Sequence, residues 1–222
     1  MTFPSRNRPP YYLLFTVLII HCFLPSWVIA TADPNHFPHY PEIGPNVRFW
    51  EKVYSTHSVN TAIIHDQNNL GLVYTTIPLR DKNIPGARKI NSKRIKRAKK
   101  HYADLLLRLA KKSKPGSKEE MRLAALFGAK HSPAAFRKAA GNIRAQTGLK
   151  ERFSEGVIRS GAYMRKIREI FRNYGLPQDL AYLPHVESSF NPNAFSKFGA
   201  SGMWQFTRAT GKSYMQIDYI ID

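Results

Sequence analysis

The sequence predicts a mainly α-helical protein with at most one small β-hairpin. Two observations lead to this class. Beyond residue 80, apolar residues recur at helical spacing within strongly polar segments, and helix start and stop residues separate those segments. Only residues 61–79 favour strands, because the β-prone runs TAIIHD and LGLVYTTIPL flank the turn-like stretch Gln67-Asn68-Asn69.

The first 32 residues are typical of a secretory signal. Two arginines precede the apolar run YYLLFTVLII, and Ala30-Thr31-Ala32 offers an A-x-A cleavage site. An uncleaved membrane anchor is the alternative, but His21 and Pro25 interrupt a run that would need about twenty apolar residues to span a bilayer. We therefore expect cleavage and export to the periplasm or cell envelope. The single cysteine, Cys22, lies in the signal, so no disulfide is expected.

The composition is strongly basic. The 222 residues include 34 Lys+Arg against 15 Asp+Glu, and removal of the signal would leave a formal charge of about +17. Such a charge implies an anionic partner. Export makes nucleic acid the least expected of these, and leaves an acidic membrane surface or an acidic envelope polymer.

Residues 33–174 are expected to form a helical N-terminal region. After an irregular leader rich in proline and histidine, VRFWEKVYS spaces Val47, Trp50 and Val53/Tyr54 as a short amphipathic helix would. The histidines of this region have no convincing metal-ligand spacing, so no metal site is expected.

The basic segment 80–114 is expected to form a long helix with one apolar face, made by Ile95, Ala98, Tyr102, Leu105, Leu106 and Leu109. Two interpretations explain this pattern equally well: a packed helix whose basic face lies in water, and a helix whose basic face holds an anionic polymer. The pattern alone does not distinguish the two.

Three further helix signals follow. Ser117-Lys118-Glu119-Glu120 is a capping box that predicts a helix to about Phe127. Ser132-Pro133 starts another helix, for which Gly148 is the expected terminator. ERFSEGVIRSGAYMRKIREIFRNYG predicts one or two more helices that stop at Gly175.

Glu187 is the candidate catalytic residue. It follows Leu180 and Leu183 at i, i+3, i+7 spacing on a helix expected to open at Pro177, with Pro184 distorting the turn before the acid. If the leucines are buried, Glu187 is buried with them. Val186 and Phe190 would then desolvate it near a helix C-terminus and raise its pKa, as a general acid requires.

For an arbitrary glutamate at such a position, a structural acid at the surface or in an ion pair is the more common outcome. The residues that follow Glu187 favour a site. SKFGASGMWQF places two glycines three apart, so the backbone can approach a ligand, and offers Gln205 as donor and acceptor for a sugar. His185 is expected to be structural.

This stretch resembles the opening signature of the lytic transglycosylase catalytic domain, E-S-x-F-N-P-x-A-x-S-x-x-G-A-x-G-x-W-Q. The matching positions are Glu187, Ser188, Phe190, Asn191, Pro192, Ala194, Ser196, Gly199, Ala200, Gly202, Trp204 and Gln205. The preceding GLPQDLAYLPHVES is similar to membrane-bound lytic murein transglycosylases of the D type. The resemblance covers residues 175–222 and implies the first part of a lysozyme-like, helix-rich fold.

The resemblance implies that Glu187 acts as general acid and base, and that Ser196 and Gln205 line the glycan site. It implies cleavage of the MurNAc-β-1,4-GlcNAc bond of peptidoglycan glycan strands without water, to give 1,6-anhydroMurNAc, and no cofactor. A single carboxylate suffices for such chemistry, because an intramolecular hydroxyl replaces activated water. Asp179 lies eight residues earlier, roughly 12 Å along a helix, and Asp218 is the other nearby acid.

Relatives of this family continue beyond the signature into an Ala-Tyr-Asn segment, which this sequence lacks. We therefore expect a domain that is incomplete at its C-terminus. The alternative to an enzyme is a non-catalytic envelope protein that binds peptidoglycan or an anionic polymer.

Overall fold

The computed structural model describes residues 36–111, 114–128, 132–214 and 216. Contacts divide the chain into Met1–Ala32 and Asp33–Asp222. The predicted signal, 1–32, lies outside the described residues, and everything below concerns the second unit.

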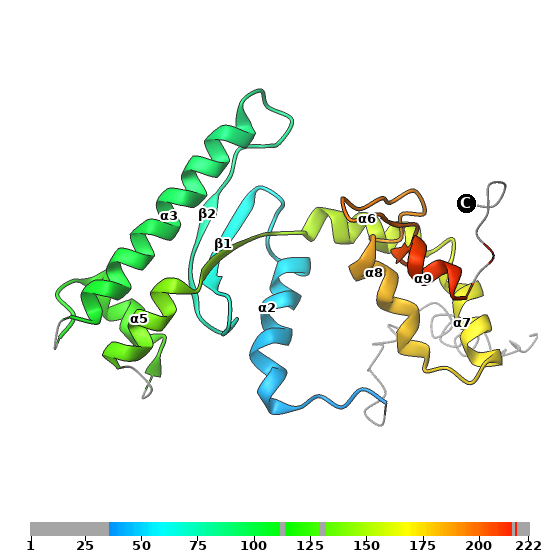
Figure 1. Ribbon diagram of the computed structural model, residues 1–222, viewed down its shortest axis with the longest axis horizontal. Helices are drawn as coiled ribbons and strands as arrows, with labels where there is room; N and C mark the ends of the chain where they lie inside the picture. Colours follow the sequence, from blue (N-terminus) through cyan, green and yellow to red (C-terminus); the bar gives the residue numbers. More distant parts are fainter. Residues whose placement is uncertain (1–35, 112–113, 129–131, 215, 217–222) are drawn as a thin grey trace, which may run out of the picture. The chain divides into compact units, whose positions relative to one another are not determined.

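A three-stranded antiparallel sheet forms the centre of the N-terminal half (Figure 1). Strand β1 (Thr61–Asp66) lies between β2 (Val73–Pro78) and β3 (Ile143–Thr147). The predicted hairpin is confirmed, but the limit of one hairpin is wrong. The third strand replaces the expected end of a helix, and its sequence IRAQT alternates apolar with polar residues, a period-two signal that helix periodicity had masked.

The two faces of the sheet bury different cores, because neighbouring side chains of β1 point to opposite sides. Ile63 packs with Phe49 and Val53 of helix α2 (Gly44–Ser55), which follows a short 3-10 helix, η1 (Pro41–Ile43). Ile64 belongs to the larger core on the other face, whose buried members are Leu72, Tyr74, Tyr102, Leu105, Leu106, Leu109, Ala110, Leu123, Phe136, Ala139 and Ile143.

Helix α2 confirms the predicted helix at 47–55, and of its expected apolar face it buries Val53. Phe49 and Val53 are buried, whereas Val47 and Trp50 are exposed. The helix therefore packs Phe49 and Val53 against the sheet and leaves Val47 and Trp50 partly open to solvent.

Helix α3 (Ala87–Leu109) confirms the long basic helix (Figure 1). Its C-terminal half buries Tyr102, Leu105, Leu106 and Leu109 as expected, and Ala98 packs partly against the same core. Its N-terminal half, from Arg88 to Lys100, buries no side chain.

Helices α4 (Lys118–Ala125) and α5 (Pro133–Gly141) begin at the predicted serine caps. Ser117 Oγ accepts from the backbone N–H of Glu120, and Ser132 Oγ accepts from that of Ala135, both at 3.1 Å. Such caps satisfy backbone donors that the first helical turn leaves unpaired.

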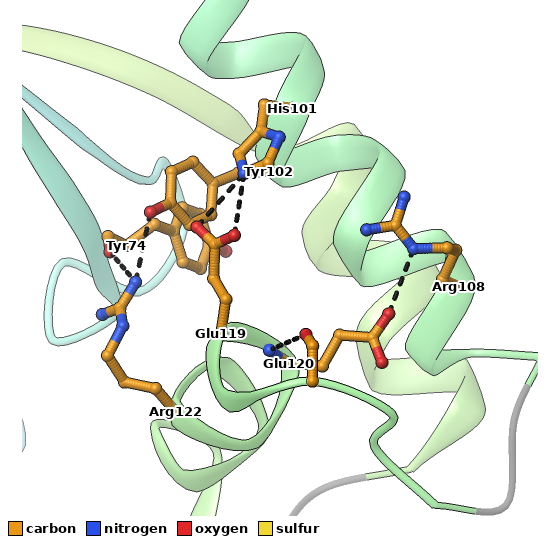
Figure 2. A network of polar contacts seen from close by, with 8 residues as sticks. Tyr74, His101, Tyr102, Arg108, Glu119, Glu120 and Arg122 are labelled. Atoms are coloured by element: carbon orange, nitrogen blue, oxygen red, sulfur yellow. Dashed lines mark hydrogen bonds and ion pairs between the residues drawn. The ribbon is translucent and has the colours of Figure 1, made fainter.

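Polar contacts tie α4 to α3 and to the sheet (Figure 2). Arg122 donates to the Tyr74 carbonyl at 2.8 Å and to the Tyr102 hydroxyl at 3.2 Å. The buried Glu120 carboxylate accepts from Arg108 Nε at 3.1 Å, and the ring of His101 contacts the Glu119 carboxylate at 3.1 Å. Helix α4 is thus bonded both to strand β2 and to helix α3.

The C-terminal half begins with helices α6 (Lys150–Ser160) and α7 (Met164–Asn173). The prediction of one or two helices before Gly175 is confirmed, and there are two. Within the described residues, no helix is long and apolar enough to cross a bilayer.

Gly148 joins the sheet to α6, and the structure gives it a role other than helix termination. It is buried, and a Cβ on it would lie 2.2 Å from the His57 carbonyl oxygen and 2.4 Å from that of Ser58. Since those atoms are backbone, no side chain can move aside.

We expect Gly148→Ala to lower the free energy of unfolding by about 1–3 kcal/mol, because the added methyl must displace backbone. Urea unfolding of the full chain measures this. Gly141→Ala is the matched control, since nothing lies within 4 Å of its added methyl. Equal stability of the two variants would contradict the close approach.

Candidate active site

The predicted helix around Glu187 is split into two short elements. The 3-10 helix η3 (Gln178–Tyr182) ends where α8 (Leu183–Glu187) begins, and Pro184 lies in the first turn of α8. Proline suits that position because it has no N–H to leave unpaired. The expected distortion before the acid therefore takes the form of a change of helix type.

The expected burial of Glu187 is wrong. Its side chain is exposed, as are Leu183 at 47% and Val186 at 62%. Because a 3-10 helix has about three residues per turn, the i, i+3, i+7 alignment breaks at the junction. The buried face consists of Ala181, Pro184 and His185 instead.

An unusual turn follows Glu187 directly. Ser189 and Phe190 both have left-handed backbones, with φ of 55° and 56°. The N–H groups of Ser188 and Phe190 donate to the Pro184 carbonyl at 3.1 and 3.0 Å. Left-handed non-glycine residues cost free energy and are concentrated at functional sites, so this turn is evidence for a site independent of any motif.

Two anchors hold the turn in place. The Phe190 side chain is fully buried, with its ring 4.5 Å from that of His185. On α6, Gly156 allows close approach, since a Cβ there would lie 3.0 Å from Ser189 Cβ, and Arg159 Nε donates to the Ser189 carbonyl at 2.9 Å. Gly156 and Arg159 lie outside residues 175–222, which the transglycosylase signature covers.

The glycine-rich loop is attached to the same turn. Ser188 Oγ donates to the Met203 carbonyl at 2.7 Å, and the Gly202 N–H donates to the Ala194 carbonyl at 2.9 Å. The loop is closed by the two-residue strands β4 (Ala200–Ser201) and β5 (Phe206–Thr207), followed by α9 (Arg208–Lys212).

Ser196 and Gln205 both shape this loop. Ser196 Oγ accepts from the N–H groups of Phe198 and Ala200 at 3.2 and 3.0 Å, which leaves its own hydrogen to donate. Gln205, at φ 52°, donates from Nε2 to the Gly202 carbonyl at 2.9 Å. No contact among the described residues joins either side chain to Glu187, and their glycan contacts stay a prediction.

An open groove of about 940 Å³ lies along the loop, with Phe195, Met203, Trp204, Phe206 and Arg208 among its lining residues. Trp204 is half-buried, and its ring centroid lies 5.9 Å from that of Phe171 on α7. Apolar rings with flanking polar groups are a common lining for ligand sites.

The other acids add little to the site. Asp179 lies in the first turn of η3, and Asp218 lies outside the described residues. Within the described part of the chain, no group of three or more His, Cys, Asp or Glu side chains is placed to hold a metal ion.

His185 and His65 are buried histidines with lowered pKa values. Burial is the cause for His185, whose Nδ1 has no hydrogen-bond partner among the described residues. Burial also lowers the pKa of His65, although its Nδ1 contacts the Asp66 carbonyl at 2.9 Å. Both rings are therefore held in their neutral form.

We expect stability to fall as the pH drops below about 6.5, the usual histidine pKa. The unfolded chain then binds protons that the folded rings resist, so each ring contributes a loss of at most about 1.4 kcal/mol per pH unit. Urea unfolding at pH 7.5, 6.0 and 5.0 measures the slope. His185→Phe should reduce it, and an unchanged slope in that variant would contradict the assignment to His185.

The Glu187 turn and the glycine-rich loop lie in a segment that a family model matches. Residues 166–220 match the family model of the Transglycosylase SLT domain. The chain thus carries a lytic transglycosylase-like domain, in agreement with the resemblance stated from the sequence.

Curated relatives match the same part of the chain. Membrane-bound lytic murein transglycosylase D of Escherichia coli, in strains K12 and CFT073, is 38% identical over 58 residues, which is 26% of this chain. A protein of Alteromonas sp. (strain M-1) named for tributyltin chloride resistance is 39% identical over 56 residues, or 25% of this chain. The chain spans 13% of the length of the first two proteins and 27% of the third.

Proposed function

We propose that this protein is a peptidoglycan lytic transglycosylase that cleaves the MurNAc-β-1,4-GlcNAc bond without water. The observation that carries the proposal is the matched segment 166–220, in which Glu187 is exposed at the start of a strained, firmly anchored turn. The matched relatives named for murein transglycosylase activity support peptidoglycan as the substrate class.

In this mechanism the Glu187 carboxyl group donates its proton to the glycosidic oxygen as the C1–O bond breaks. The C6 hydroxyl of the same MurNAc then attacks C1 and returns its proton to the Glu187 carboxylate. One carboxylate thus serves both steps, because the nucleophile is part of the substrate. A bound glycan strand would cover the exposed carboxylate and exclude water from it.

The test is incubation of the full chain with purified sacculi and mass spectrometry of the released material. We expect soluble muropeptides that end in 1,6-anhydroMurNAc. Products with reducing MurNAc ends would identify a hydrolase instead, and absence of soluble product would contradict catalysis by this chain.

We further propose export to the periplasmic envelope, with residues 1–32 as a cleaved signal. The basis is the sequence pattern of that segment alone. Mass spectrometry of the protein recovered from the envelope tests cleavage after Ala32.

A second candidate function, binding of an anionic envelope polymer, is favoured by the N-terminal half of α3. Between residues 88 and 100 it has eight cationic side chains and no acid, namely Arg88, Lys89, Lys93, Arg94, Lys96, Arg97, Lys99 and Lys100. Among the described residues, only Lys100 of these eight forms an ion pair, with Asp104 at 2.9 Å. Arg88, Lys96 and Lys99 also line a groove of about 690 Å³.

Co-sedimentation with sacculi tests this function. Binding that depends on the polymer should weaken as salt rises from about 50 to 300 mM, because exposed charges are screened. Reversal of Lys93, Lys96 and Arg97 to glutamate should abolish it, and unchanged sedimentation of that variant would rule the polymer out.

A further inference from the structure

Helix α2 has an aromatic pair that the fold leaves partly uncovered. Trp50 and Tyr54 lie one turn apart, and their rings are stacked with centroids 5.9 Å apart and planes at 29°. Trp50 is 39% exposed, although the same helix buries Phe49 and Val53 against the sheet. Trp50 also contacts the Phe49 ring in a T-shaped arrangement, with centroids 5.5 Å apart, so packing covers part of the Trp50 ring and leaves the rest exposed.

The pair is fixed relative to α6. The Leu149 N–H donates to the Val53 carbonyl at 2.8 Å, and the Glu151 carboxylate accepts from the Val59 N–H at 2.8 Å. The Tyr54 ring lies 5.4 Å from that of Phe153 on α6. Backbone, carboxylate and ring contacts thus hold α2 at the start of α6.

The same helix α6 holds the turn after Glu187. Phe153, which contacts Tyr54, also lies 5.2 Å from the ring of His185 on α8, two residues before the candidate acid. Farther along α6, Arg159 binds the carbonyl of Ser189. The aromatic pair and Glu187 therefore share one support.

The charge of Glu187 reaches Tyr54. Burial raises the pKa of the Tyr54 hydroxyl, and the negative charge of Glu187 raises it further. The hydroxyl therefore stays protonated and can donate a hydrogen bond.

We propose that Trp50 and Tyr54 extend the glycan site of the proposed transglycosylase. Trp50 stacks on the apolar face of an N-acetylated pyranose, and Tyr54 is a positioning residue that orients the sugar toward Glu187. The pair suits this ligand, because an aromatic ring combines a broad apolar face with, in tyrosine and tryptophan, a polar group that can bond a hydroxyl or amide. Both residues lie outside the matched segment 166–220, and the inference rests on the proposed function.

The test is isothermal titration of the full chain with chitopentaose, in a Glu187→Gln background that prevents turnover. Trp50→Ala should weaken binding about five- to tenfold, as loss of an aromatic contact does, and Trp50→Phe should retain most of the affinity. Tyr174→Ala, which removes a ring that is 78% exposed elsewhere, should bind as the parent does.

Tyr54→Phe tests the positioning role with sacculi as substrate and Glu187 intact. It should lower kcat and change the pH profile of turnover while KM stays within about twofold, because the ring remains and only the hydroxyl is lost. A smaller folded fraction would also lower the apparent kcat at constant KM, so the changed pH profile is the readout that separates the positioning role from a loss of stability.

The inference fails if the parent does not bind chitopentaose, or if both Trp50 variants bind as tightly as the parent. These outcomes are distinct from failure of the proposed function. Sugar binding that depends on Trp50, without anhydro product, would support the role of Trp50 in sugar binding and contradict the proposed transglycosylase activity. Anhydro product together with unchanged sugar binding by Trp50→Ala would support the transglycosylase activity and contradict the role of Trp50.

Discussion

Replacement of Glu187 by glutamine is expected to lower the rate of 1,6-anhydromuropeptide release by about a hundredfold to ten-thousandfold, the usual contribution of a general acid–base group. Glutamine keeps the size and polarity of the side chain but cannot transfer a proton. Because Glu187 is exposed, the substitution should leave folding intact. Mass spectrometry of sacculus digests measures the rate.

Glu169→Gln is the matched control, since Glu169 is an exposed acid of the same matched segment whose described ion pair is with Lys166 at 3.0 Å. It should release product at the parental rate. Parental activity in Glu187→Gln would transfer the acid–base role to another residue.

Replacement of Phe190 by alanine is expected to lower the free energy of unfolding by about 3–5 kcal/mol, as for other fully buried aromatic side chains. The ring is 0% exposed and lies against His185 and Tyr163. Its loss leaves a cavity beneath the turn, so the position of Glu187 should be lost with it. Urea unfolding followed by tryptophan fluorescence measures the effect.

Phe198→Ala serves as the comparison for this variant. Phe198 belongs to the same glycine-rich loop but is 81% exposed, so its removal should change stability by no more than about 0.5 kcal/mol. Similar losses in both variants would mean that the Phe190 ring does not anchor the turn.

The sequence predicted best those features that depend on near neighbours. The buried face of α3 follows from a regular helical period, and the starts of α4 and α5 follow from serine side chains that bond their own first turns. Strand β3 was missed because the alternation in IRAQT is short and the predicted helix from Ser132-Pro133 to Gly148 covered it, while its pairing with β1 joins residues far apart in the chain.

The surroundings of Glu187 were predicted less well. Motif spacing located the acid, but burial was inferred from one continuous helix, and the change of helix type at Leu183 turned that face outward. The left-handed backbones of Ser189 and Phe190 depend on Gly156 and Arg159 of α6, which is about thirty residues away in sequence but in contact with the turn. A single sequence contains no local signal for such tertiary constraints.

Helix α6 contacts both α2 and the turn after Glu187, so a mutation near α6 can change activity without touching the substrate. A change at Gly148 or Val59, near the start of α6, acts on the helix that holds Ser189. Lost activity in such a variant would then reflect a displaced acid rather than a lost substrate contact. Assignments of substrate residues outside 166–220 therefore need a binding measurement beside every activity measurement.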